Sequence, residues 1–103
     1  MAKLDINITA RTDLANIKLY LRQCSEEELY PKFEERIIKS WQHLASFPQS
    51  GTKPRIKEFI QYRYIIKKPY YIFYTYQEQN DTVTIQRIVH TARNFKKLLE
   101  ENL

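Results

Sequence analysis

Four side chains in the second half of the chain have types suited to chemistry on a phosphodiester. Arg87, His90 and Arg93 lie on and just after the last predicted strand, and Arg63 lies on an earlier one. A histidine flanked by arginines can act as general acid or base while the guanidinium groups stabilise the developing charge. The same set can instead bind a phosphate or a carboxylate-rich partner. A third interpretation is structural, with His90 hydrogen-bonded to a backbone carbonyl at the strand end.

Other kinds of catalytic site lack the residues that they need. The chain has one glycine, which excludes a glycine-rich phosphate loop. Its single cysteine, Cys24, excludes an internal disulfide and a multi-cysteine metal site. His43 and His90 have no His or Cys neighbour at ligand spacing. We therefore expect no metal and no cofactor, and any nuclease built on this chain would be metal-independent.

The positive charge is concentrated in the second half of the chain. The formal net charge is +5, yet residues 1–50 carry seven basic and seven acidic side chains, whereas residues 51–103 carry ten and five. The window 53–68, which includes Lys67, has six basic side chains against Glu58 alone. A one-sided positive field favours a polyanion or an acidic protein as partner. A solvated surface kept for solubility is the alternative.

Length and composition indicate a single domain over residues 1–103. This length suits one domain, and a 14% aromatic content supplies enough large apolar side chains for a packed core. No run of 18 apolar residues is present, and the first residues contain no apolar stretch typical of a signal peptide. We therefore expect a cytoplasmic protein with no membrane partner.

The first helix is expected soon after a short N-terminal strand, in which Leu4, Ile6 and Ile8 alternate with polar residues. Thr9 is expected to cap this helix and Asp13 to lie in its first turn. Its apolar stripe comprises Ala10, Leu14, Ile17, Leu21 and Cys24.

A second helix is expected from Pro31, at the first helical position, after a separate turn over 25–30. The proline and the single glycine of the segment 47–51 end it. The core stripe of this helix comprises Phe33, Ile37, Trp41 and Leu44.

The second half is predicted to form strands. Segments 60–67, 70–76 and 82–90 are rich in Tyr, Ile, Val, Phe and Thr, and the polar residues 77–81 suit a hairpin loop. Thr91 is expected to cap a last helix over 92–101. The order β-α-α-β-β-β(-α) predicts an α+β fold of two layers, in which a helical hairpin packs on a mostly antiparallel sheet.

The tyrosines of these strands have two interpretations. Basic and aromatic side chains interleaved on a sheet can form a stacking platform for nucleotides. A small domain also needs aromatic rings in its core. We expect Tyr70 and Tyr74 to pack in the core, while Tyr62, Tyr64 and Tyr71 are open to a surface role.

Four segments in the same order resemble the RelE/ParE superfamily of bacterial toxins. They are Thr9–Ile17 followed by Tyr20, Leu44–Gly51 with its Leu-x-x-Phe-Pro-x-x-Gly spacing, Arg63 with Tyr70–Tyr74, and Ile85–Arg93. The resemblance covers nearly the whole chain and implies the toxin of a type II toxin–antitoxin (plasmid stabilisation) module, silenced by a cognate antitoxin. The superfamily's fold is the two-layer order predicted above.

The resemblance implies one of two mechanisms. ParE-like members inhibit DNA gyrase and are not enzymes, whereas RelE-like members cleave messenger RNA on the ribosome. Tyr71 stands where the RelE-like branch has an arginine, and no tyrosine follows Tyr76, which favours the ParE-like branch. The residues expected to bind target or partner are Arg63, Lys67, Tyr71, Arg87, His90 and Arg93. In the alternative, a nuclease, His90, Arg63 and Arg93 would be catalytic.

Overall fold

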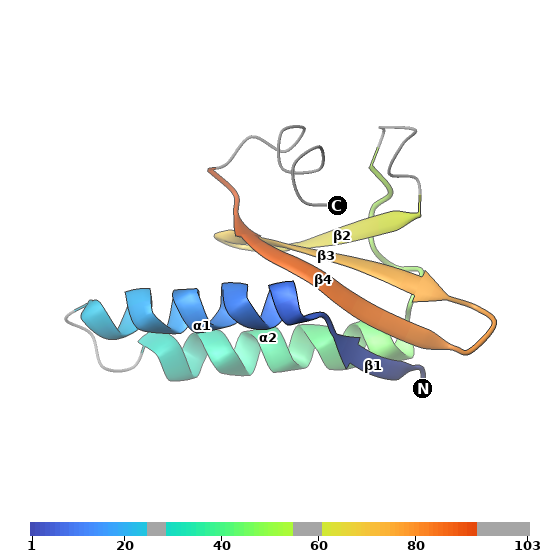
Figure 1. The fold of residues 1–103 in the computed structure, drawn as a ribbon, viewed down its shortest axis with the longest axis horizontal. Coiled ribbons are helices and arrows are strands. Elements are labelled where there is room, and N and C mark those ends of the chain that lie inside the picture. Colours follow the sequence, from blue (N-terminus) through green and yellow to red (C-terminus); the bar gives the residue numbers. More distant parts are fainter. Residues whose placement is uncertain (25–28, 55–60, 93–103) are drawn as a thin grey trace.

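The computed structural model describes residues 1–24, 29–54 and 61–92, and in these ranges the chain has the two-layer architecture that the sequence predicts. Two helices lie across one face of a four-stranded sheet (Figure 1). No helix in these ranges is long and apolar enough to cross a membrane. In chain order the elements are β1 (Lys3–Ile6), α1 (Ile8–Gln23), α2 (Leu29–Ser46), β2 (Tyr62–Lys67), β3 (Tyr70–Gln77) and β4 (Thr82–His90).

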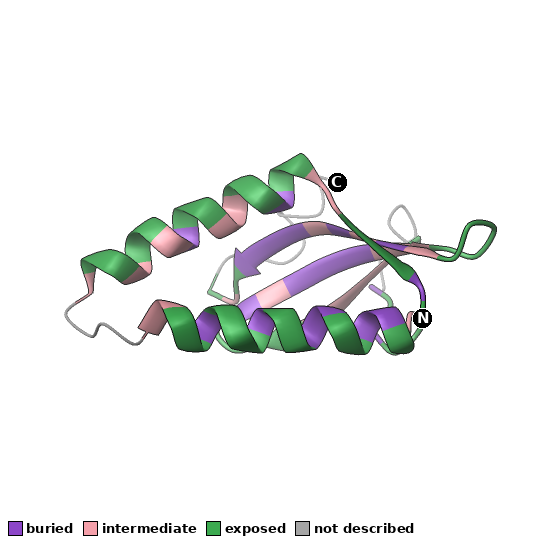
Figure 2. Cartoon of the chain, turned by 90° about the horizontal axis from the view of Figure 1, so that it is seen from below, coloured by how far each residue is buried: buried purple, intermediate pink, exposed green. Residues whose placement is uncertain are grey.

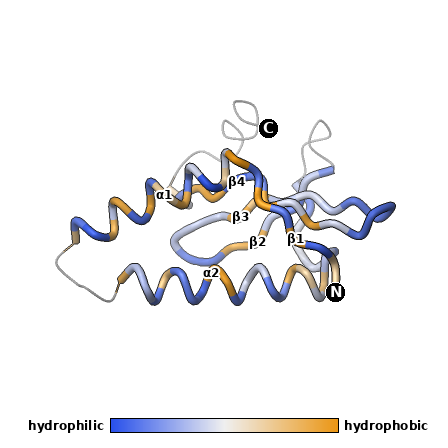
Figure 3. Tube along the Cα trace, turned by 60° about the horizontal axis from the view of Figure 1, so that its bottom comes forward, coloured by the Kyte–Doolittle hydropathy of each residue, from blue (hydrophilic) through white to orange (hydrophobic). Residues whose placement is uncertain are grey.

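The sheet is mixed and mostly antiparallel, with the strand order β1-β4-β3-β2. β2, β3 and β4 form consecutive antiparallel pairs, while β1 pairs in parallel with β4. The loops that join β2 to β3 and β3 to β4 are hydrophilic (Figure 3), which fits their place at the ends of the sheet.

A bulge divides β4 into two parts with different neighbours. Tyr74 pairs with Ile85 and Phe73 with Arg87, so Gln86 is the extra residue. The Gln86 amide accepts from Asn7 Nδ2 at 2.9 Å and donates to Thr75 Oγ1 at 3.1 Å. β1 pairs only with Thr82–Ile85. The bulge therefore marks the point at which β1 ends and α1 takes its place beside β4.

α1 begins earlier than the sequence predicts, because Asn7 and not Thr9 caps it. Asn7 Oδ1 accepts from the Thr9 N–H at 2.8 Å, and the Asn7 N–H donates to the Ile85 carbonyl at 2.9 Å. Ile8 is helical and 77% exposed, so the expected alternation of the first strand stops at Ile6. Asp13 consequently lies beyond the first turn, where it contacts β4 instead of the helix N-terminus.

α2 begins at Leu29, so Pro31 lies within its first turn and not at its first position. Proline is tolerated there because the first N–H groups of a helix have no partner inside it. Residues 25–28, which contain most of the expected turn, lie outside the described residues. The predicted stripe of α2 is buried against the sheet (Figure 2): Phe33, Ile37, Trp41 and Leu44.

The core lies between the helices and the middle strands β3 and β4. Ile72, Val83 and Ile85 are fully buried, and they pack with Leu44 of α2 and Ala10 of α1 in one cluster. Tyr70 and Tyr74 belong to the same cluster, which confirms their predicted core positions. The predicted last helix, apart from Ala92, lies outside the described residues, as does Arg93.

Candidate functional site

The Arg63 side chain is hydrogen-bonded to the loop that follows α2. Its Nη1 donates to the carbonyl oxygens of Gln49 and Gly51 at 3.1 and 3.0 Å. Its neighbour across the strands is Tyr74, which anchors the same loop. The guanidinium group therefore ties β2 to this loop.

Tyr74 explains the single glycine of the chain. Its buried hydroxyl accepts from the Gly51 N–H at 2.8 Å and donates to the Pro48 carbonyl at 2.9 Å. The pKa of Tyr74 is raised, mainly because burial disfavours the charged phenolate. A β-carbon at Gly51 would lie 2.7 Å from Tyr74 Cε1 and closer still to the hydroxyl. Only glycine leaves room for the ring at this point.

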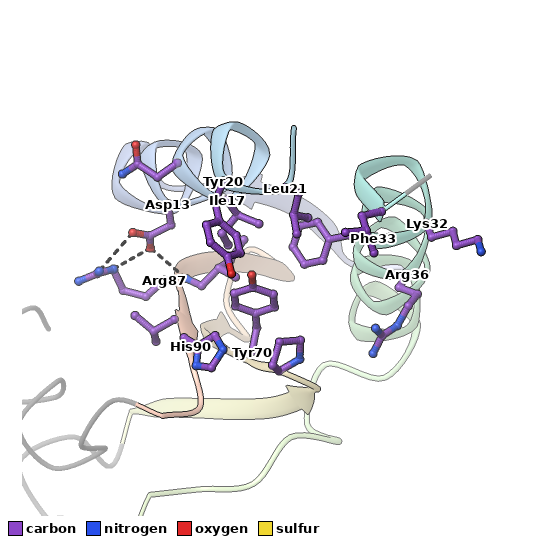
Figure 4. Close-up of a pocket in the computed structure, with 15 residues that line it drawn as sticks. Asp13, Ile17, Tyr20, Leu21, Lys32, Phe33, Arg36, Tyr70, Arg87 and His90 are labelled. Atoms are coloured by element: carbon purple, nitrogen blue, oxygen red, sulfur yellow. Dashed lines mark hydrogen bonds and ion pairs between the residues drawn. The ribbon is translucent and has the colours of Figure 1, made fainter. Parts of the chain in front are cut away.

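Arg87 forms a shielded ion pair with Asp13 of α1 (Figure 4). Its Nε lies 2.7 Å from Asp13 Oδ2 and its Nη2 lies 3.2 Å from Oδ1, with side-chain exposures of 10% and 13%. Asp13 Oδ2 also accepts from the backbone N–H of Ile88 at 3.0 Å. The Asp13 carboxylate thus supplies the counter-charge for a shielded guanidinium group. It also accepts a hydrogen bond from a backbone N–H of β4.

His90 is exposed at the end of β4. Its Nδ1 accepts from the backbone N–H of Ala92 at 3.1 Å, and its ring meets the Tyr70 ring edge-on at 5.6 Å. The local hydrogen bond therefore runs from backbone to ring, and not from ring to a carbonyl. Because Nδ1 accepts, the neutral imidazole carries its proton on Nε2.

The predicted site residues do not gather around one point. Lys67 and His90 flank Tyr70 in one cross-strand row, so these two lie at the same end of the sheet. Arg63 lies farther along β2, opposite Tyr74. Tyr71 points to the face of the sheet away from the helices, where it contacts Tyr64 and Phe73 with ring centroids at 5.7 and 5.9 Å.

A groove of about 800 Å³ lies between α1, α2 and the ends of β3 and β4. Its Tyr20 and Tyr70 hydroxyls point toward one another in Figure 4. Burial, followed by the proximity of Tyr20, raises the pKa of Tyr70. The polar side chains Lys32, Arg36 and His90 contribute to the lining. The apolar lining includes Ile17, Tyr20, Leu21, Phe33, Tyr70 and Ile88.

The groove and the role of Asp13 were not predicted from the sequence. The signal for Asp13 was present, because it falls between Ala10 and Ile17 on the inward stripe of α1. A carboxylate on an apolar stripe requires a buried partner. No local sequence pattern predicts the groove itself, because its walls come from four separate elements. Among the described residues, no three His, Cys, Asp or Glu side chains gather in a way that could hold a metal ion.

Comparison with known proteins identifies relatives of this architecture. The family model described as the ParE toxin of the type II toxin–antitoxin system parDE matches residues 5–95. The crystal structure of the toxin–antitoxin complex RelBE2 from Mycobacterium tuberculosis contains a similar chain, at 21% identity and a TM-score of 0.65; the match covers 86% of this chain and 96% of that one.

The isolated RelE toxin of E. coli is also similar in fold. It shares 12% identity at a TM-score of 0.57, over 97% of this chain and 95% of that one. No curated protein sequence matches the chain significantly. Both structural matches have low identity, so they support the fold, whereas the family model matches the sequence over most of its length.

Proposed function

Because the chain belongs to the ParE toxin family of type II toxin–antitoxin systems, we propose that it acts by binding and inhibiting DNA gyrase. Membership of this family implies a cognate antitoxin as partner. In the proposed mechanism the chain is an inhibitory binding protein and not an enzyme. The antitoxin keeps the chain from gyrase for as long as the two are bound.

The commitment of two arginines to structural partners carries this proposal. A nuclease needs cations that are free to stabilise charge on a scissile phosphate. Arg63 donates to two backbone carbonyls, and Arg87 is paired with Asp13 at 2.7 Å. Each guanidinium group thus already has a partner that links two parts of the fold. Binding to a protein target has no such requirement for free cations.

A ribosome-dependent endoribonuclease is the second candidate, and the exposure of His90 favours it. The imidazole stands at a strand end, with Nδ1 held by the Ala92 N–H and the ring held by Tyr70. A positioned and accessible imidazole is suited to general acid–base catalysis. In that case Lys67, at the same end of the sheet, would be the nearest of the described basic candidates by strand register.

Two assays on the purified chain separate these functions. We expect inhibition of gyrase supercoiling and no cleavage of message on ribosomes. His90→Asn, which keeps an acceptor for the Ala92 N–H, should inhibit gyrase as far as it remains folded. His43→Ala is the matched control, since His43 is the other exposed histidine. Message cleavage that is lost in a folded His90→Asn chain, with supercoiling unaffected by the parent chain, would overturn the proposal in favour of the nuclease.

A further inference from the structure

Phe47 is an exposed aromatic residue of the loop that follows α2. The Tyr74 hydroxyl holds this loop through the Pro48 carbonyl and the Gly51 N–H. The Phe47 side chain, in contrast, is 59% exposed, and its ring lies 5.1 Å from the ring of the exposed His43. Packing within the described part of the chain therefore does not account for an aromatic ring at this position.

A hollow separate from the groove lies beside Phe47. It has a volume of about 640 Å³ and lies between the end of α2, the loop that follows it and the end of β3. Figure 1 shows the end of α2 and the β3–β4 hairpin at the same end of the molecule. The lining of this hairpin hollow includes Phe47, Pro48, Gln49, Tyr76 and Glu78. Two aromatic rings and a carboxylate therefore meet at one surface.

The walls of the hairpin hollow are held in place by hydrogen bonds within the chain. Arg63 Nη1 donates to the Gln49 carbonyl at 3.1 Å, which fixes the loop backbone. Gln49 Nε2 donates to Glu78 Oε1 at 2.9 Å and so joins the loop to the hairpin. The Tyr76 hydroxyl donates to Asp81 Oδ1 at 2.7 Å. A site whose walls are already ordered loses less conformational entropy when a partner binds.

The charge of the hairpin hollow is negative, although the chain as a whole carries +5. Glu78 and Asp81 each accept a hydrogen bond from a neutral donor. Neither carboxylate has an ion-pair partner among the residues that the structure describes. α2 ends at Ser46, which lines the hollow, and the carbonyl end of a helix also favours a cation. The hollow is therefore complementary to a positive charge.

Arginine is the cation that suits this combination of groups. Its planar guanidinium stacks on aromatic rings and pairs with a carboxylate through two parallel N–H groups. Phe47 and Tyr76 provide the rings. Glu78 retains acceptor positions beyond the one that Gln49 occupies. A lysine ammonium would use the carboxylate but lacks the flat surface for stacking.

We infer that the hairpin hollow binds an arginine side chain of the target protein, which in the proposed function is gyrase. The guanidinium lies against Phe47 and Tyr76 and pairs with Glu78. The identity of the partner rests on the proposed function, whereas the group that is recognised follows from the hollow itself. A second copy of this chain is a less suitable occupant, because two chains of charge +5 repel each other.

Two peptides that differ in one charge test the hollow directly. The probe is a short glycine-flanked peptide with one arginine, and its control carries citrulline, which has a similar shape without the charge. An NMR titration of the isotope-labelled chain measures both. We expect the arginine peptide to shift the amide signals of residues 46–50 and of Glu78, and the citrulline peptide to shift them much less. Equal shifts by both peptides, or none by either, would overturn the inference.

Two variants of the hollow, each with a matched control, test the contacts. Glu78→Gln removes the charge and keeps an acceptor for Gln49, while Glu35→Gln removes the same charge from an exposed position outside the lining. Phe47→Ala is paired with Leu19→Ala, because these side chains are 59% and 60% exposed and Leu19 does not line the hollow. The two hollow variants should weaken binding of the arginine peptide about fivefold or more, and the controls by less than about twofold.

Binding to immobilised gyrase tests whether the target uses the hollow. In surface plasmon resonance, Glu78→Gln and Phe47→Ala should each weaken binding about tenfold, with both controls close to the parent chain. Because all four positions are exposed, the variants should fold, and circular dichroism checks this. Folded hollow variants that bind gyrase as tightly as the parent chain would show that the inference is wrong.

Failure of the inference can be distinguished from failure of the proposed function. A parent chain that leaves gyrase active but binds the arginine peptide through Glu78 would refute gyrase as the target and support the hollow. A parent chain that inhibits gyrase but binds neither peptide would do the reverse. Sedimentation of the chain alone tests the other occupant: a dimer that Glu78→Gln dissociates would place a second copy in the hollow and overturn the inference.

Discussion

At the scale of single residues, the ion pair between Asp13 and Arg87 has a large predicted effect on stability. Both side chains are about nine-tenths buried, so removing the carboxylate leaves a shielded guanidinium without a counter-charge. Asp13→Ala should lower the free energy of unfolding by about 3–5 kcal/mol, as for other buried pairs that lose one partner. Urea denaturation measures this change.

The exposed pair of Glu35 and Lys39 on α2 is the control for this experiment. Its atoms lie 2.9 Å apart, but its side chains are 65% and 71% exposed, so solvent screens the attraction. Glu35→Ala should therefore change stability much less than Asp13→Ala does. Equal effects would mean that burial does not determine the strength of the Asp13 contact.

Tyr74 gives the chain a pH-dependent stability in the alkaline range. Its pKa is raised in the folded chain, chiefly by burial, so the folded state holds the phenolic proton more tightly than the unfolded state. This contribution is complete below the unfolded pKa of about 10 and is lost as the pH rises through the folded pKa. In Tyr74→Phe the alkaline loss, measured by urea denaturation between pH 7 and 11, should be smaller.

The same substitution tests the anchor on the loop at neutral pH. Tyr74→Phe leaves the Gly51 N–H and the Pro48 carbonyl without their partner, which should lower stability by about 1–3 kcal/mol. A neutral-pH stability equal to that of the parent chain would show that water satisfies both groups.

Some residue positions could be predicted from the sequence, and the partners of others could not. Alternation along the strands placed Tyr70 and Tyr74 in the core and His90 at a strand end. The partner of Arg87 lies 74 residues away, and Arg63 bonds to backbone carbonyls, which carry no sequence signal. Residue type alone therefore marks both arginines as free cations, whereas their contacts make them structural.

At the scale of elements, α2 is held to the sheet by a stripe in which Trp41 is the largest side chain. It is 8% exposed, so Trp41→Ala should lower the free energy of unfolding by about 3–5 kcal/mol through lost contacts and a cavity. Trp41 Nε1 is buried, with no hydrogen-bond partner among the described residues. Trp41→Phe, which removes this N–H and keeps an aromatic ring, should retain most of the stability.

Thermal denaturation of the two variants distinguishes packing from other roles of Trp41. If both lowered the melting temperature equally, the indole N–H would have a partner that matters. If neither lowered it, Trp41 would contribute little to the attachment of α2.

The element boundaries show what local sequence patterns can and cannot predict. The last strand was predicted as 82–90 and is observed as Thr82–His90, because β-rich segments and polar loops alternate clearly there. Both helices start two residues earlier than predicted, because Asn7 and not Thr9 caps α1 and because a proline such as Pro31 is acceptable within a first turn. The bulge at Gln86 depends on contacts with Asn7 and Thr75, which no local pattern reveals.

At the scale of the whole molecule, two cations of the basic second half lie side by side at one end of the sheet. Lys67 and Lys68 are exposed at the end of β2, which is an outer strand of the sheet. The groove lies between the helices and the other layer, with its own cations on α2. Cations therefore lie both at this end of the sheet and on the α2 side of the groove.

The basic end of β2 should accelerate encounter with gyrase. Charges on a surface steer association over roughly a Debye length, about 10 Å at 0.1 M salt. Lys67→Gln combined with Lys68→Gln should slow association with immobilised gyrase about tenfold at low salt, with little change in dissociation. The difference should shrink as salt is added. Surface plasmon resonance over a salt series measures both rates.

A chain with Lys3→Gln and Lys39→Gln is the control, since it loses the same charge from exposed positions in the first half. If steering comes from the end of β2, this control should associate nearly as fast as the parent chain. Equal slowing in both chains would mean that net charge alone governs the encounter. A faster dissociation with unchanged association would instead identify Lys67 and Lys68 as direct contacts with the target.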